Sequence, residues 1–262
     1  MARNDELQMV RSLGWLEGFT NLVANENGRW WKTRRWLVQV LIWLVIVNGL
    51  MALIVVSTPE MKPDDVLAGF LKLWGLVLPI GVVILAQDLI IQEKQSGTAA
   101  WILSKPASHS AFILSKIAAN AFGILVTVVT VQGIVGYLQI WSSTGKAYSV
   151  VPFIGALGLV FLSLLFYLTL TIMLGTLFNS RGAVISIPLV LVFSVQILKF
   201  SSGLAQIMPW NLTTSVGAGN PALGLVLVQG LPLPSLAPLF ATVLWCLLFT
   251  CIALWKFHRE EL

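Results

Sequence analysis

Residues 150–178 read VVPFIGALGLVFLSLLFYLTLTIMLGTLF and contain no charged side chain. A helix that crosses a bilayer needs about 20 consecutive, predominantly apolar residues, so this stretch is long enough to form one. A soluble domain carries about 25% charged residues, whereas this chain of 262 residues carries 10% and is 57% hydrophobic. The sequence therefore predicts an all-α integral membrane protein.

Five further stretches have the length and composition of membrane spans. Together with residues 150–178 they predict six transmembrane helices in a single membrane domain over residues 1–262, at 36–57, 66–91, 110–141, 150–178, 183–200 and 236–257. The segments between them are far shorter than an independently folded domain. We therefore expect any soluble activity to come from a partner protein.

The basic residues indicate how the spans are oriented. Those expected on one side are Arg3, Arg11, Arg29, Lys32, Arg34, Arg35, Lys94, Lys105, Lys116, Arg181, Lys256 and Arg259. Because cytoplasmic loops carry the excess of Lys and Arg, we expect both termini in the cytoplasm and the spans in the plasma (inner) membrane of a bacterium. The net charge of +5 is then explained by basic residues beside the lipid bilayer, and no nucleic-acid partner is expected.

The N-terminal segment 5–35 predicts an amphipathic helix that lies in the membrane interface. Its apolar residues recur at helical spacing, at Met9, Leu13, Leu16, Phe19 and Val23. It ends in side chains that suit the head-group level of a bilayer, namely Trp30, Trp31, Arg34 and Arg35. We interpret these four residues as a membrane anchor, and recognition of a particular lipid is the alternative.

Residues 201–235 predict a re-entrant outer segment between the fifth and sixth spans. The segment contains no charged residue, and four prolines break it into pieces too short to span a membrane. An exposed apolar loop of this length is unfavourable. We therefore expect one or two short helices that dip into the outer leaflet and are covered by protein.

The connection after the second span reads QEKQSGTAAWILSKP over residues 92–106. Gly97 can adopt the left-handed conformation that ends a helix, and Thr98 can cap a new one. The new helix, 98–104, is short, presents apolar side chains and ends before Pro106. A short apolar helix at the cytoplasmic surface needs a groove to pack into, unless its side chains dip into lipid instead.

This connection resembles the ABC type-2 transporter permease family. Members typically show a Glu and a basic residue, then Gly-Thr, a short apolar helix, a Pro, and a Lys at the start of the third span, which are matched here by Glu93, Lys94, Gly97, Thr98, Pro106 and Lys116. Ala100 stands where the family often has an acid. The resemblance implies that 98–104 is a cytoplasmic coupling helix, with ATPase-coupling residues Glu93, Lys94, Gly97, Thr98, Trp101, Ile102, Leu103 and Pro106.

The resemblance also implies a function and a set of partners. The chain would be the permease subunit of an exporter for a hydrophobic or amphiphilic substrate, driven by two copies of a separate ATPase subunit that bind ATP and magnesium. It would pair with a second permease, identical or homologous. The sequence has no G-x-x-x-x-G-K-[ST] motif, so we expect this chain to bind no cofactor and to be no enzyme itself.

Polar groups within the spans are the candidates for a substrate path, and we select Gln87, Asp88 and Asn120. Asp88 can pair with Lys94 or face a central cavity. Lys72 is expected to extend its amino group outward to the membrane surface.

Two other function classes stay open. An ion-coupled secondary transporter places acids or broken helices near the bilayer midplane, and a membrane-embedded enzyme needs convergent nucleophiles, bases or metal ligands. His109 and His258 both lie at the ends of spans, without neighbouring Cys or His at metal-ligand spacing. We therefore expect no catalytic and no metal-binding residue.

Overall fold

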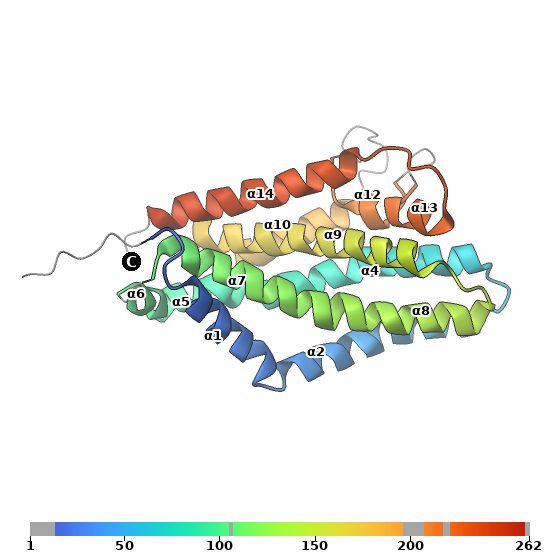
Figure 1. Cartoon of the computed structure of the whole chain (residues 1–262), viewed down its shortest axis with the longest axis horizontal. Helices are drawn as coiled ribbons and strands as arrows, with labels where there is room; N and C mark the ends of the chain where they lie inside the picture. The colour runs from blue at the N-terminus through green and yellow to red at the C-terminus, as the bar shows by residue number, and fades with distance from the viewer. Residues whose placement is uncertain (1–13, 105–106, 196–206, 217–220, 260–262) are drawn as a thin grey trace, which may run out of the picture.

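The protein is almost entirely helical in its computed structural model, which describes residues 14–104, 107–195, 207–216 and 221–259 (Figure 1). Helix accounts for 81% of the structure, and these ranges contain no β-strand. Within them, five helices are long and apolar enough to cross a membrane: Arg35–Ser57, Pro63–Gln95, His109–Thr144, Val150–Leu177 and Ala237–His258. The expected all-α architecture is therefore confirmed, and the length and composition of these five helices suggest a membrane-embedded protein.

Three of the five long helices are made of successive segments. The first comprises α2 (Arg35–Trp43), the π-helical η1 (Leu44–Gly49) and α3 (Leu50–Ser57). The second comprises α4 (Pro63–Ala86) and α5 (Asp88–Gln95), and the third comprises α7 (His109–Ile124), the π-helical η2 (Leu125–Thr130) and α8 (Val131–Thr144). The remaining two are α9 (Val150–Leu177) and α14 (Ala237–His258).

The expected sixth span and the re-entrant segment are seen only in part. Helix α10 (Arg181–Ser194) has 14 residues, which correspond to about 21 Å, less than the ~30 Å hydrocarbon core. Residues 196–200 of the expected span, and 201–206 and 217–220 of the expected re-entrant segment, lie outside the described residues. The described remainder forms α12 (Trp210–Thr213) and α13 (Leu223–Gln229), which pack against α9 and α4.

Local sequence signals set several helix ends. Pro63 is the first residue of α4, a position at which the backbone amide has no hydrogen-bond partner within the helix, so the missing N–H of proline costs nothing. Asp64 and Asp65 follow in the first turn, where the positive end of the helix dipole favours negative charge. Ser108 begins α7, because its hydroxyl accepts a hydrogen bond from the amide of Ala111 at 3.0 Å. Gly145 ends α8 in the left-handed conformation.

Helix α9 is the centre of the bundle and packs against α4, α10, α13 and α14 (Figure 1). Helix α1 (Phe19–Trp31) lies along α7. One end of the bundle, called here the α6 end, holds α1, α5, α6 (Thr98–Leu103) and the end of α14. The opposite end, called the α13 end, holds α12, α13 and the start of α4.

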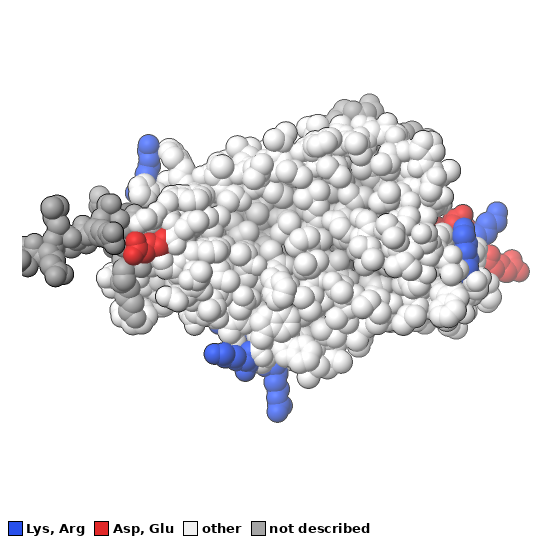
Figure 2. Space-filling view, viewed as in Figure 1, with Lys and Arg blue, Asp and Glu red and all other residues white. Residues whose placement is uncertain are grey.

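On the face shown in Figure 2, the charged side chains gather at the two ends of the molecule, with cations also at the turn between α1 and α2, and leave a broad uncharged band between. Large apolar side chains are exposed along the long helices, for example Val45, Leu53, Ile154 and Leu244. Such a continuous apolar surface is unstable in water. Its position between two charged ends is what a bilayer-embedded protein requires.

Close contact at Gly81 joins α2 to α4. A Cβ atom built on Gly81 would lie 2.0 Å from the ring of Trp43, a buried side chain. We predict that Gly81→Leu lowers the free energy of unfolding by about 1–3 kcal/mol, because the ring must be displaced from a packed core. The measurement is the thermal unfolding midpoint of the purified protein in detergent.

Gly158→Leu is the matched control, since Gly158 in α9 is exposed and a Cβ there meets nothing within 4 Å. This variant is expected to unfold at the wild-type temperature. Equal midpoints for the two variants would contradict the described packing of α2 on α4.

Candidate functional site

The junction between α5 and α6 forms the sharp change of direction that the sequence predicts. Gly97 has φ of +70°, the left-handed region that favours glycine. Its amide donates to the carbonyl of Lys94 at 3.2 Å. The hydroxyls of Ser96 and Thr98 lie 2.8 Å apart across the turn, and α6 begins at Thr98.

Helix α6 has one face against the protein and one face outward. Ala99 is fully buried and Ile102 packs partly against the core, whereas Trp101 is 61% exposed. The side chain of Leu103 and all of Pro106, two further residues expected to take part in coupling, lie outside the described residues. The short helix lies at the α6 end (Figure 1), and the exposure of Trp101 means that it presents a large aromatic side chain there.

Glu26, Arg29, Glu93 and Lys116 form an ion cluster at the C-terminal part of α5, called here the buried ion cluster because three of its side chains are buried, while that of Arg29 is 44% exposed. Lys116 is 0% exposed, and its Nζ lies 2.9 Å from Oε1 of both Glu26 and Glu93. Arg29 Nη1 donates to Glu93 Oε1 at 2.9 Å and lies 3.3 Å from Glu26 Oε1. The cluster joins Glu26 and Arg29 of α1 to Glu93 of α5 and Lys116 of α7. Its two positive and two negative charges cancel.

The balance of charge explains how these groups tolerate burial. Burial by itself lowers the pKa of the Arg29 guanidinium, but Glu26 and Glu93 outweigh it and raise the pKa above its usual value. Arg29 therefore stays charged at any physiological pH. A buried ion pair is costly to break, because removal of one partner leaves the other charged and unpaired in a low-dielectric site.

Two polar contacts extend the cluster along the contact between α1 and α7. The indole Nε1 of Trp30 donates to Asn120 Oδ1 at 3.1 Å, and Asn120 Nδ2 donates to the carbonyl of Lys116 at 2.8 Å. The ring of Trp30 covers Gly123, where a Cβ would lie 2.5 Å from it. Trp30 is only 7% exposed.

The four expected anchor residues lie in different environments in the structure. Trp30 lies inside the protein and differs from the expectation of an indole among lipid head groups. Trp31 is half-buried and contacts Trp36 and Phe122 with ring centroids 6.4 and 5.8 Å away. Arg34 and Arg35 are exposed at the turn between α1 and α2.

Asp88 and Lys94 connect α5 to its other neighbours. Asp88 Oδ1 lies 2.9 Å from Nε of Arg181, at the start of α10. Lys94 Nζ donates to the carbonyl of Thr176 in α9 at 3.4 Å. Asp88 therefore meets Arg181 rather than Lys94, the partner considered from the sequence.

A polar cavity of about 540 Å³ separates the α1–α2 turn from α4 and α5. Its lining includes Arg29, Arg35, Asp88 and Glu93, and Glu93 Oε2 has no hydrogen-bond partner among the described residues. A smaller cavity of about 60 Å³ shares Arg35 with it and is lined by Asn120. Two of the three expected path residues, Asp88 and Asn120, therefore line neighbouring cavities, whereas the lining of neither includes Gln87.

Glu26 belongs to the buried ion cluster although its position in the sequence does not single it out. The signal for it is an acid in the middle of the amphipathic helix, three residues before Arg29, together with Lys116 as the lone charge in the apolar stretch 110–141. Burial of a charged side chain on an apolar helix face is unfavourable unless the side chain pairs with an opposite charge. Within the described ranges, no group of three or more His, Cys, Asp or Glu side chains could hold a metal ion.

The buried ion cluster yields a stability prediction. Lys116→Met leaves Glu26 and Glu93 with Arg29 as their shared cation and an uncompensated negative charge in the cluster, and it is expected to lower the free energy of unfolding by about 3–5 kcal/mol. Lys146→Met is the matched control, because Lys146 pairs with Asp64 at 2.8 Å while both side chains are nearly half exposed, and such pairs contribute about 0–1 kcal/mol. Thermal unfolding of both variants in detergent tests this, and a loss at Lys116 no larger than at Lys146 would contradict it.

One family model matches the chain, over residues 36–262, and that family is described as "Protein of unknown function (DUF2705)". The match begins at α2 and covers every later helix, while α1 precedes it. Among the curated proteins, none matches. The family model covers most of the sequence, and the chain is a member of the DUF2705 family.

Proposed function

We propose that this chain is the membrane subunit of an ABC transporter of the type-2 permease class, exporting a hydrophobic or amphiphilic substrate. ATP and magnesium are bound by two copies of a separate ATPase subunit, and a second permease, identical or homologous, completes the path. The observation that carries the proposal is α6, a short helix that presents Trp101 outward from a braced junction. The sequence resemblance of residues 92–106 supports the same assignment.

Trp101 is suited to be the anchor of the ATPase contact. Tryptophan buries a large area with few rotatable bonds and is enriched among the residues that dominate protein interfaces. Here 61% of its surface is accessible while Ala99, two residues earlier, is fully buried. The helix is therefore held by one face and offers the other to the partner.

The contacts at the base of α6 support a role in transmitting force. Glu93 is held by α1 and α7 through Arg29 and Lys116, Asp88 meets α10 at Arg181, and α9 accepts a hydrogen bond from Lys94. Any displacement of α6 by an ATPase is thus passed to helices on several sides. A loop without these contacts would move alone.

The proposed orientation puts the α6 end in the cytoplasm of a bacterial cell and both termini with it. Cations at this end among the described residues include Arg29, Lys94, Lys256 and Arg259, and Arg34 and Arg35 lie at the turn between α1 and α2. An excess of cations beside the membrane marks the cytoplasmic face. The ATPase and its ATP would then be on the side that the coupling helix faces.

The partner is tested by affinity capture of the tagged full-length chain from its own host. A co-purified protein with a P-loop nucleotide-binding domain, identified by mass spectrometry, and ATP hydrolysis by the eluate are expected. Trp101→Asp is expected to weaken this association by about 2 kcal/mol or more, about thirtyfold in affinity, because it puts a charge where an apolar anchor is needed.

Trp141→Asp supplies the matched control. Trp141 is 53% exposed, near the end of α8 at the α13 end of the molecule, and its replacement is expected to leave the ATPase bound. Capture of the same ATPase by the Trp101→Asp variant at the wild-type level would overturn the assignment of α6. Capture of no P-loop protein by the wild-type chain would overturn the proposed function.

The orientation is tested by cysteine labelling of intact cells in a Cys246→Ser, Cys251→Ser background. Ala147→Cys, in the exposed loop at the α13 end, is expected to react with a membrane-impermeant maleimide. Ser96→Cys, at the α5–α6 junction, is expected to react only after the cells are permeabilised. The reverse pattern would contradict a cytoplasmic α6.

A further inference from the structure

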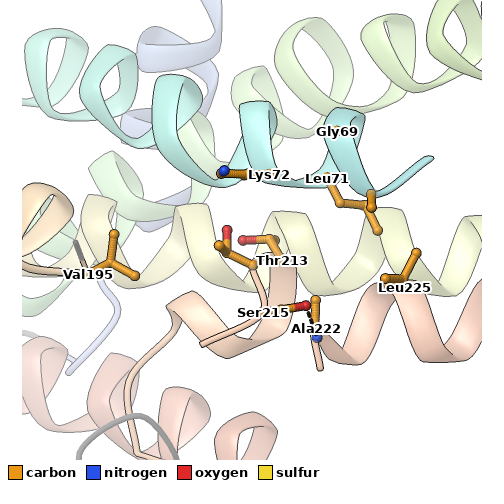
Figure 3. Close-up of a pocket in the computed structure, with 10 residues that line it drawn as sticks. Gly69, Leu71, Lys72, Val195, Thr213, Ser215, Ala222 and Leu225 are labelled. Atoms are coloured by element: carbon orange, nitrogen blue, oxygen red, sulfur yellow. Dashed lines mark hydrogen bonds between the residues drawn. The ribbon is translucent and has the colours of Figure 1, made fainter. Parts of the chain in front are cut away.

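A third cavity, of about 240 Å³, lies between α4 and the end of α12 toward the α13 end of the molecule (Figure 3). Lys72 of α4 lines it, and Figure 3 places Thr213 and Ser215 on the segment that faces α4. The walls also include apolar side chains, Val195 and Leu225 among them. The cavity therefore combines one cation and several hydroxyl groups with an apolar lining.

Lys72 lies well inside the second long helix. It follows Pro63, the first residue of α4, by nine positions, which correspond to about 13 Å along the helix. An ionised lysine at such a depth is unfavourable without a counter-charge, water or an outward path for its amino group. Its side chain lines the cavity and is exposed.

The described lining of the cavity contains no carboxylate to pair with Lys72. Lys72 has no ion-pair or hydrogen-bond partner among the described residues. The sequence contains no Asp or Glu between Glu93 and Glu260, so the segments that adjoin α12 and α13 supply none either. Nearer the start of α4, Asp64 already meets Lys146 and Tyr148.

We propose that this cavity is a binding site for the anionic head group of an amphiphile, a phosphate, carboxylate or sulfate joined to an apolar body. Lys72 supplies the positive charge, and charge-assisted hydrogen bonds to it are stronger than neutral ones. The proposal goes beyond the assignment of the chain as an ABC subunit, because the site is formed by this chain alone.

The hydroxyl groups complete the site. The amide of Ala222 donates to Ser215 Oγ at 3.0 Å, which holds this hydroxyl in position and leaves its own proton able to donate to an anion. Thr214 adds a second hydroxyl at the cavity. At Gly75, α12 approaches α4 closely, since a Cβ there would lie 2.1 Å from Thr213 Oγ1. This contact fixes the position of the hydroxyl-bearing wall relative to the wall that carries Lys72.

The test is an equilibrium titration of the purified full-length protein, in non-ionic detergent, with a fluorescently labelled phosphatidylglycerol. Labelled diacylglycerol is the uncharged comparison. Wild-type protein is expected to bind the anionic lipid more tightly, and Lys72→Met to lose about tenfold or more of that affinity, as expected for a charged hydrogen bond. Binding of diacylglycerol is expected to be the same for both.

Lys72→Arg, which keeps the charge, is expected to retain binding. So is Lys62→Met, which removes an exposed lysine just before α4. If Lys72→Met does not fold, Ala68→Phe fills the cavity, since Ala68 lines it, and is expected to abolish binding with Lys72 intact. Equal affinity of wild type and Lys72→Met for phosphatidylglycerol, or no preference of wild type for it over diacylglycerol, would overturn the proposal.

Competition with inorganic phosphate identifies the source of the anion. No displacement at millimolar phosphate is expected, because the apolar walls contribute to the affinity for an amphiphile. Displacement would overturn the choice of an amphiphile in favour of a free anion. Neither result depends on the ATPase, so failure here is distinguishable from failure of the proposed transporter assignment.

Discussion

The fully buried amino group of Lys116, 2.9 Å from both Glu26 and Glu93, is the interaction on which the α6 end depends. The chain has no acidic residue from position 94 to 259, so the cations of this stretch that form ion pairs must do so with carboxylates from outside it. Lys116, Lys146 and Arg181 do so. These long-range pairs tie the late helices to the early ones at both ends of an otherwise apolar bundle, where apolar packing in lipid supplies little driving force.

The same pairs explain why a short helix can be useful at the α6 end. Helix α6 has few residues and could not hold a fixed position alone. It follows α5 directly, and α5 is held on different sides by the buried ion cluster and by Arg181. A braced junction with an outward tryptophan is a suitable element for docking, which is why we link it with an ATPase. At the other end, Tyr148 donates to Asp64, and burial together with this bond raises the pKa of Tyr148 above its usual value.

Much of the fold was predictable because membrane spans are coded by composition alone. Five of the expected spans appear within a few residues of their predicted bounds, and Gly97 has the predicted left-handed backbone. The sequence pattern shows which face of a helix is apolar but not whether it meets lipid or protein. The pattern therefore predicts a lipid contact for Trp30, which packs on Gly123, and it does not single out Glu26, which pairs with Lys116. Pairs that join residues 90 positions apart cannot be found from spacing within one helix.

The most direct test of the central claim is photocrosslinking in living cells with p-benzoylphenylalanine at position 101. The account predicts a crosslinked product of this chain with a protein that carries a P-loop nucleotide-binding domain, identified by mass spectrometry of the purified adduct. The same probe at position 141, at the opposite end of the bundle, is predicted to give no such product. Crosslinks from position 101 to lipid alone would contradict the account, because α6 would then lie in the membrane surface and would not dock on an ATPase.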